Sequence, residues 1–341
     1  MTADPTVSVV IPVYNEEATL AALFARLYPA LDALGKSYEV IFVNDGSRDR
    51  SAALLREQWE RRRDVTRVVL LNANYGQHTA IVAGFERCRG ARVVTLDADL
   101  QNPPEEIGKL LAAMDGGHDY VGGVRRTRED SLWRRLASRA MNGLRERITR
   151  IRMTDQGCML RAYSREIAAA VAASREVSTY IPALAYTFAA SPAEVEVAHE
   201  ERAGGTSKYS LYKLVRLNFD LVTGFSLVPL QLFSMFGMLV SALALATYVV
   251  VIAYRLVMAD WRQWETVYLL WDRDILAFFL IGVLVFGLGL VGEYVGRIYQ
   301  QVRERPRYTV RATLENEAAT AEDRDPLRVA ETLPPRHTAA G

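Results

Sequence analysis

The sequence predicts an α/β fold with a mostly parallel central sheet, followed by an interfacial helix and a two-helix transmembrane hairpin. Two observations support this prediction. Short runs rich in Val and Ile alternate with amphipathic stretches in the first part of the chain, and two long stretches of the second part carry no charge. Near-continuous apolar strands joined by helices are typical of a parallel sheet covered on both faces.

Four short apolar runs have the length and composition of buried strands. Each is followed by turn-forming or polar residues, as expected where a strand ends. The runs are Val7–Val13, Tyr38–Val43, Arg67–Leu71 and Arg92–Leu96. Apolar residues recur at helical spacing from Leu20 to Leu34, and Gly35 follows where a helix C-cap is expected.

The charge of the chain is balanced overall and uneven locally. It has 41 basic and 40 acidic residues, so no global field argues for nucleic acid or for disorder. Arginine is concentrated between Arg125 and Arg152, which indicates either a nearby phosphate or a solvated basic helix. The four histidines are scattered and Cys88 and Cys158 lack metal spacing, which argues against a metal site built from these residues.

Two uncharged stretches predict membrane-spanning helices. They run from Leu221 to Tyr254 and from Ile275 to Gly292, and a helix needs about 20 mostly apolar residues to span a bilayer. Basic residues precede the first stretch and follow the second, and no signal peptide opens the chain. Both ends of the hairpin and the N-terminal domain are therefore expected in the cytosol.

The chain is expected to have four parts. They are a cytosolic domain over 1–205, an interfacial amphipathic helix over 206–226, two transmembrane helices within 227–300 (about 227–257 and 274–298), and a largely disordered cytosolic tail over 301–341. The tail beyond Arg311 is rich in Ala, Glu, Thr, Pro and Arg, which is the basis for expecting disorder there.

A glycine motif in the second apolar stretch matches a dinucleotide-binding fingerprint. The segment Gly287–Gly292 lacks the preceding strand and the βαβ context that this motif requires. Gly289, Gly292 and Gly296 fall on one helical face, which predicts a packing surface between transmembrane helices instead.

Carboxylates follow two of the predicted strands. Asp45 follows the second, and Asp97 and Asp99 follow the fourth. Ligands of open α/β sheets bind beyond the carboxyl ends of the strands, and carboxylate oxygens suit Mg²⁺ or Mn²⁺ together with phosphate oxygens. Gln101 repeats the two-residue spacing and can add a carbonyl ligand. No other phosphate-binding loop is present in the sequence, so this edge of the sheet is the expected phosphate and metal site.

Three ordered segments resemble the signatures of family 2 glycosyltransferases with the GT-A fold, a Rossmann-like domain. They are Val9–Glu17 (VVIPVYNEE), Val43–Ser47 (VNDGS) and Asp97–Pro103 (DADLQNP). With the C-terminal hairpin, they resemble the polyprenyl-phosphate glycosyltransferases of that family over roughly residues 7–310. The resemblance implies a UDP-sugar donor, a polyprenyl phosphate acceptor, a bacterial inner membrane location and a homo-oligomer such as a tetramer.

The resemblance also implies roles for single residues. Those expected around the donor nucleotide are Pro12, Tyr14, Glu16, Asp45, Asp97 and Ala98. Those expected at the metal are Asp97, Asp99 and Gln101. Asp99 and Asp155 are the expected catalytic residues, Asp155 as an orienting group on the acceptor side with a base role left open.

A narrower likeness is to the members of this group that transfer a formamido-arabinose to undecaprenyl phosphate. It rests on Asn74–His78, Leu96–Ile107, Gly157–Tyr163 and Gly292–Tyr299. Departures near the expected site, at Asn44, Thr154–Gln156 and Ala203–Thr206, leave glucose, mannose or N-acetylglucosamine as alternative sugars. The implied product is the lipid-linked sugar that modifies lipid A phosphates.

A lipid phosphate acceptor sets the expected mechanism. Its second pKa is about 6, so it is largely ionised at pH 7 and brings its own nucleophilic oxygen. The metal then stabilises the leaving diphosphate, and in-line displacement inverts the anomeric centre. The residues expected to hold the acceptor phosphate are Arg125, Arg126, Arg139, Arg202, Ser207 and Lys208.

Two other classes of protein are weighed against this reading. A processive polysaccharide synthase would require a Gln-x-x-Arg-Trp element and more membrane helices, and the sequence has neither. A scaffold or nucleic-acid-binding protein would interleave aromatic residues with the basic ones, but only Trp133 lies between Arg125 and Arg152.

Overall fold

The computed structural model describes part of the chain in detail. The described residues are 4–125, 153–155, 157–174, 180–200, 228–258, 273–302 and 306–316. They belong to two compact units, one holding the sheet and its helices and the other holding the two long helices. The units are described separately below.

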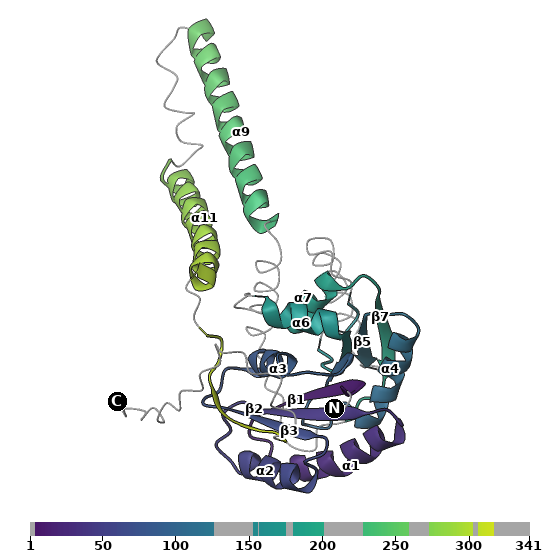
Figure 1. The fold of residues 1–341 in the computed structure, drawn as a ribbon. Coiled ribbons are helices and arrows are strands. Elements are labelled where there is room, and N and C mark those ends of the chain that lie inside the picture. Colours follow the sequence, from purple (N-terminus) through teal and green to yellow (C-terminus); the bar gives the residue numbers. More distant parts are fainter. Residues whose placement is uncertain are drawn as a thin grey trace, which may run out of the picture. The chain divides into compact units, whose positions relative to one another are not determined.

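The first unit is built on one sheet of eight strands (Figure 1). Its order is β7-β5-β6-β4-β1-β2-β3-β8, and only β6 and β8 run against the others. The strands are β1 Val7–Val13, β2 Tyr38–Asn44, β3 Thr66–Leu71, β4 Arg92–Thr95, β5 Tyr120–Arg125, β6 Arg161–Ser164, β7 Pro192–Val197 and β8 Val310–Leu314. The predicted mostly parallel α/β sheet is confirmed, and the four strand predictions are correct to within one residue at each end.

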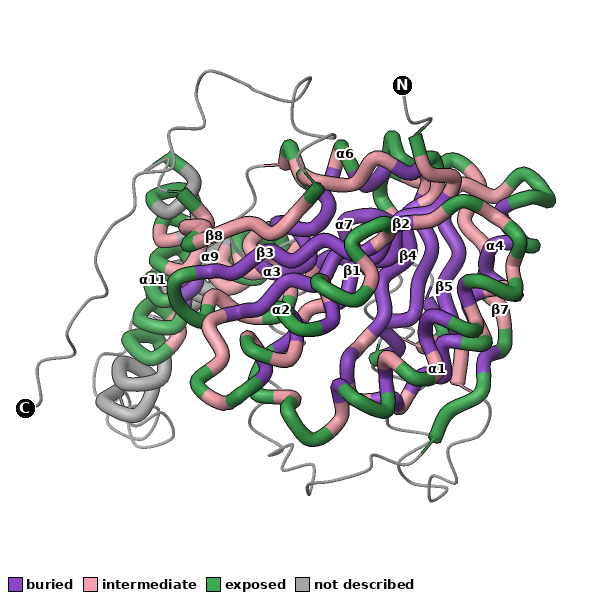
Figure 2. Tube along the Cα trace, turned by 60° about the horizontal axis from the view of Figure 1, so that its bottom comes forward, coloured by how far each residue is buried: buried purple, intermediate pink, exposed green. Residues whose placement is uncertain are grey.

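Helices cover both faces of this sheet. They are α1 Leu20–Ala33, α2 Ser51–Arg61, α3 Gln77–Phe85, η1 Pro104–Glu106, α4 Ile107–Asp115, α6 Arg165–Ala173 and α7 Ile181–Phe188. The buried faces of α1, α2 and α4 share one apolar cluster with alternate residues of β1, while α3, α6 and α7 lie on the opposite face (Figure 1). The central strands are therefore buried on both sides, as Figure 2 shows.

The first helix follows directly from the leucine spacing. Leu20, Leu23, Leu27 and Leu31 are fully buried along one face of α1. Gly35 adopts a φ of 63° just past its end, the left-handed conformation that a side chain rarely takes and that closes many helices.

The C-terminal segment departs from the prediction of a disordered tail beyond Arg311. Residues Val310–Leu314 form β8, which pairs antiparallel with β3. Ala312 and Leu314 alternate along the strand and pack on the apolar core, and Glu315 binds Arg67 at 2.5 Å. This strand covers what would otherwise be an open sheet edge. The prediction overlooked it because the apolar pattern is only five residues long.

The second unit contains α9 Val228–Met258 and α11 Arg273–Val302, at the positions of the two predicted transmembrane helices. Among the residues that the structure describes, no helix combines the length and the hydropathy that crossing a bilayer requires. The two helices meet where a Cβ on Gly287 would lie 2.2 Å from the Phe233 ring.

The glycine motif Gly287–Gly292 lies inside α11, so its interpretation as a helical segment and not a nucleotide loop is confirmed. A Cβ on Gly289, Gly292 or Gly296 would meet no described atom within 4 Å. Within the described part of the chain, Gly287 makes the close approach between the two helices, and the predicted packing face at Gly289, Gly292 and Gly296 stays a prediction.

Candidate active site at the carboxyl edge of the sheet

The predicted donor residues lie at one edge of the sheet. Strands β1, β2 and β4 are parallel neighbours, with Val13 opposite Asn44 and Val10 opposite Thr95. Their carboxyl ends therefore place Tyr14, Asp45 and Asp97 on the same edge. Pro12 and Glu16 are half-buried there, Ala98 is buried, and the Tyr14 ring is exposed.

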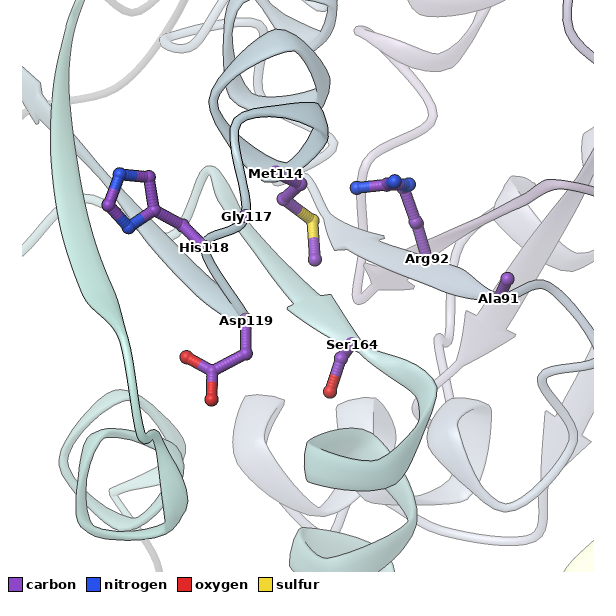
Figure 3. A pocket seen from close by; sticks show the side chains of 7 residues that line it. All are labelled: Ala91, Arg92, Met114, Gly117, His118, Asp119 and Ser164. Carbon is purple, nitrogen blue, oxygen red and sulfur yellow. The ribbon is translucent and has the colours of Figure 1, made fainter.

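A hollow lies at the opposite end of the strands (Figure 3). It has a volume of about 280 Å³ and includes Arg92 at the start of β4 and Ser164 at the end of β6. Asp119 in its wall already accepts the backbone N–H groups of Ala190 and Ser191. None of the predicted site residues lines it, so it is separate from the carboxyl edge.

Asp45 is held by the backbone of a neighbouring loop. Its side chain is 2% exposed, and its two oxygens accept the N–H groups of Tyr75 at 2.7 Å and Gly76 at 2.9 Å. Burial raises the pKa of this carboxyl, although both hydrogen bonds oppose the shift. Asp45 therefore fixes the loop that leads into α3.

Gly46 allows this loop to approach. Its φ is 66°, and a Cβ would lie 2.4 Å from the carbonyl carbon of Ala73. Side chains disfavour that φ and the space is already filled by backbone. The Asn44-Asp45-Gly46 turn therefore requires glycine at its third position.

Asp45→Asn tests the role of this turn. An asparagine has one acceptor oxygen, so one of the two N–H groups would face an amino group and lose its partner, at a cost of about 1–3 kcal/mol. We expect UDP affinity, measured by calorimetry, to fall about tenfold or more. The matched control is Asp64→Asn, since that exposed acid pairs with Arg62 away from this turn. Unchanged UDP affinity in Asp45→Asn would show that the loop held by Asp45 does not contribute to UDP binding.

Asp97 and Asp99 are the carboxylates that follow β4. Gln77, the first residue of α3, donates to Asp97 Oδ1 at 2.6 Å, and Asp99 Oδ1 accepts the backbone N–H of Gln101 at 3.1 Å. Burial, with the charges of Asp99 and Glu16, raises the pKa of Asp97 to about 7. Crowded carboxylates of this kind favour a bound cation.

The backbone between Asp99 and Gln101 is strained. Leu100 has a φ of 62°, which costs roughly 1–2 kcal/mol for a residue with a side chain. Its side chain is 8% exposed and belongs to the apolar core, which holds it in place. The strained turn sets the directions in which the side chains of Asp99 and Gln101 extend from the backbone.

The acids fit a divalent cation that keeps water and phosphate ligands. Among the described residues, no three His, Cys, Asp or Glu side chains form a group that could hold a metal. Mg²⁺ typically uses one or two protein carboxylates and completes its shell with water and phosphate oxygens. Two acids therefore suffice if the donor diphosphate supplies further ligands.

Asp155 and Arg125 form a bidentate ion pair. The guanidinium donates at 2.6 Å and 2.8 Å to the two carboxylate oxygens, and both side chains are less than a fifth exposed. Burial raises the pKa of Asp155, but the Arg125 hydrogen bonds and charge outweigh it and lower the pKa. Asp155 is thus an ionised group held in one orientation.

The ion pair and the acids lie at the same edge of the sheet, because Arg125 ends β5, which runs parallel to β4. The charge of Arg125 lowers the pKa of Asp97, although burial and neighbouring acids dominate. Arg125, which was predicted as an acceptor ligand, is already paired with Asp155, a partner that sequence spacing could not indicate.

Five predicted acceptor residues lie outside the described residues. They are Arg126, Arg139, Arg202, Ser207 and Lys208. The described chain reaches Glu200, whose N–H donates to the Gln101 carbonyl at 2.9 Å. Arg26 binds Glu105 and Glu200 at 2.9 Å each, so the segment that precedes Arg202 is fastened to the loop of the metal site.

Gln77 and His78 are site neighbours to which the sequence analysis gave no role. Gln77 contacts Asp97 directly. Burial lowers the pKa of His78 to about 4, so its imidazole is neutral at pH 7, and it packs edge-on against Tyr180. The segment Asn74–His78 supplied the only signal, as part of a sequence likeness.

Comparisons with known proteins identify the family and relatives of this chain. The family model described as "Glycosyl transferase family 2" matches residues 8–171. Relatives named undecaprenyl-phosphate 4-deoxy-4-formamido-L-arabinose transferase include one from Edwardsiella ictaluri, 50% identical over 89% of this chain and 93% of the relative. Others are from Klebsiella pneumoniae, 46% identical over 94% and 97%, and Pseudomonas aeruginosa, 49% identical over 90% and 91%.

A solved structure also matches part of the chain. It is glucosyl-3-phosphoglycerate synthase from Mycobacterium tuberculosis in complex with Mn²⁺, uridine diphosphate and phosphoglyceric acid. The match has a TM-score of 0.46 and 20% identity, and covers 64% of this chain and 77% of that one.

Proposed function

Because this chain belongs to glycosyltransferase family 2 and is a glycosyltransferase, we propose that it transfers 4-deoxy-4-formamido-L-arabinose from its UDP donor to undecaprenyl phosphate. The matching family model and the relatives confirm the family resemblance of the sequence motifs. The specific sugar and acceptor come from the names of relatives about half identical over most of the chain. The lipid-linked product would serve the modification of lipid A that underlies polymyxin resistance.

One observation carries the proposal. The donor-side acids follow β4 and the acceptor-side ion pair begins at Arg125, the last residue of the parallel strand β5, so both lie at the same edge of the sheet. Asp45 and its loop are suited to the nucleoside, and Asp97 and Asp99 to the diphosphate with Mn²⁺ or Mg²⁺. When bound, the cation would supply Lewis-acid stabilisation of the leaving diphosphate.

The chain's own residues then bind the donor and the acceptor and orient them for the reaction. The acceptor phosphate is largely ionised at pH 7 because its second pKa is about 6. Its oxygen attacks the anomeric carbon as the bond to UDP breaks, so the configuration inverts and no proton need be removed. Asp155 is already ionised and bound to Arg125, which suits it to orient the acceptor side rather than to accept a proton.

The donor sugar is tested with a panel of nucleotide sugars. Purified protein receives undecaprenyl phosphate, Mn²⁺ or Mg²⁺, and UDP-linked formamido-arabinose, glucose or N-acetylglucosamine, or GDP-mannose. The proposal predicts lipid-linked product with the formamido-arabinose donor at a kcat/KM at least tenfold above the others. Turnover with a hexose donor alone would contradict it.

We also propose that the protein is a multi-pass protein of the bacterial inner membrane with both termini and the catalytic domain in the cytosol, and that it forms a homo-oligomer. Large apolar side chains are exposed along both long helices, among them Leu232, Met235, Leu284 and Phe286. Apolar surface of this extent is rare on soluble monomers.

The membrane proposal predicts a fractionation result. Expressed in bacteria, the chain should remain in the membrane pellet after carbonate washing and dissolve only in detergent, because burying such side chains in lipid is favourable. A chain that lacks residues 228–302 but keeps the strand Val310–Leu314 serves as the comparison. Release of the full chain by carbonate would contradict the proposal.

A further inference from the structure

Arg161 is a fully buried arginine directly behind the acceptor side of the site. It is the first residue of β6 and its exposure is 0%. An isolated buried charge is costly unless hydrogen bonds satisfy it. The sequence analysis and the proposed mechanism give this residue no role.

Its guanidinium binds three separate parts of the chain. Nε donates to the Cys158 carbonyl at 2.8 Å, Nη2 to the Asp155 carbonyl at 2.6 Å, and Nη1 to the Tyr120 hydroxyl at 2.5 Å. The three oxygen acceptors are neutral, as is the Met153 sulfur to which Nη1 also donates at 3.7 Å, so the bonds do not cancel the charge. These hydrogen bonds connect Arg161 in β6 to Tyr120 in β5 and to the backbone carbonyls of Asp155 and Cys158.

Two glycines make room for the guanidinium groups of Arg125 and Arg161. A Cβ on Gly122 would lie 2.9 Å from Arg161 Nη1, and a Cβ on Gly157 would lie 2.6 Å from Arg125 Nη2. Gly122 therefore leaves space for the guanidinium of Arg161, and Gly157 leaves space for that of Arg125. Arg161 holds the backbone oxygen of Asp155, while Arg125 holds its carboxylate.

We propose that Arg161 is a positioning residue for the acceptor step, which fixes the backbone of Asp155 and so aligns the Arg125–Asp155 pair with the anionic acceptor group. This inference rests on the proposed function. It separates the acceptor side, which depends on Arg161, from the donor side, where Asp45 and its loop are held by other contacts.

The test compares Arg161→Met and Arg161→Lys with the full chain in detergent, using undecaprenyl phosphate and the best donor of the wild type. Arg161→Met keeps the length and apolar stem but no donor, and should lower kcat at least thirtyfold and raise acceptor KM. The KM for the donor and UDP affinity should stay within about twofold. Lysine restores the charge and one hydrogen bond, and should recover part of kcat.

Two controls keep the result specific. Arg92→Met removes the same group from a half-buried arginine that pairs with Asp115 at the other end of β4, and should leave both KM values unchanged. Tyr120→Phe deletes one of the three acceptors and keeps the ring, so it should lower kcat less than Arg161→Met does. It carries the test if the methionine variant does not fold.

Wild-type acceptor KM and kcat in folded Arg161→Met would overturn the inference, as would equal losses on donor and acceptor sides or wild-type kinetics in Tyr120→Phe. These outcomes differ from failure of the proposed function. In that case the wild type itself would give no product with undecaprenyl phosphate.

Discussion

Asp97→Asn is expected to abolish transfer while making the protein more stable. The substitution removes a carboxylate from the metal site and keeps an oxygen for the Gln77 hydrogen bond. We expect kcat/KM to fall at least a thousandfold, which corresponds to about 4 kcal/mol of transition-state stabilisation. Turnover with saturating Mn²⁺ or Mg²⁺ measures this loss.

The stability gain follows from the raised pKa. An aspartate titrates near 3.8 when unfolded, and Asp97 titrates at about 7 when folded. The folded state therefore holds its proton more tightly, and wild-type stability falls as the pH rises from 3.8 to 7. In metal-free buffer at pH 8, the free energy of unfolding of Asp97→Asn should be up to about 4 kcal/mol higher than that of the wild type, with no difference near pH 4.

Asp115→Asn is the matched control for this experiment. That exposed acid pairs with Lys36 and Arg92, away from the site. It should leave kcat/KM unchanged and stability slightly lower. A destabilised Asp97→Asn at pH 8, or one that keeps its activity, would contradict the electrostatic crowding inferred for Asp97.

Asp155→Asn should damage both turnover and stability. It leaves the half-buried Arg125 without a charged partner, and breaking a pair of this burial costs about 2–3 kcal/mol at pH 7. We expect kcat to fall about a hundredfold while UDP affinity is retained, because the donor residues keep their contacts. Urea unfolding and calorimetry measure the two effects.

The pH dependence of this stability loss has a defined sign. The folded pKa of Asp155 is below its unfolded value of 3.8, so the ion pair stabilises the protein above that value and the contribution disappears as the pH falls through the folded pKa. The two proteins should converge in acid. Glu105→Gln, which breaks the more exposed pair with Arg26, should cost less than about 1 kcal/mol. Equal stability of Asp155→Asn and wild type at pH 7 would refute the pairing.

The sheet and its carboxyl edge were predictable because both depend on local patterns. Runs such as Val7–Val13 can be stable only when buried, and an acid that directly follows a parallel strand must lie at the carboxyl edge. The placement of Asp45 and Asp97 therefore needed no knowledge of distant partners. The protonation of Asp97 could not be predicted in this way, because its pKa depends on burial and on the charge of Glu16, which follows another strand.

The partners of the acceptor side could not be predicted. Arg125 and Asp155 are separated by 30 positions in the chain, and no periodicity links a strand end to a later turn. The same holds for Arg161, whose motif reads as the start of an ordinary strand. Strand β8 was missed because its stability comes from pairing with β3, not from its own five residues.

The most direct test offers two acceptors that share the lipid and differ in the phosphate group. Purified protein receives the UDP-linked formamido-arabinose with either undecaprenyl phosphate or undecaprenol at pH 7.5, each with Mn²⁺ and with the metal chelated. The proposed mechanism predicts an inverted lipid-linked product from the phosphate in the presence of metal and none from the alcohol. Transfer to undecaprenol at a comparable rate would show that the enzyme removes a proton itself, and would contradict an acceptor that brings its own charged oxygen.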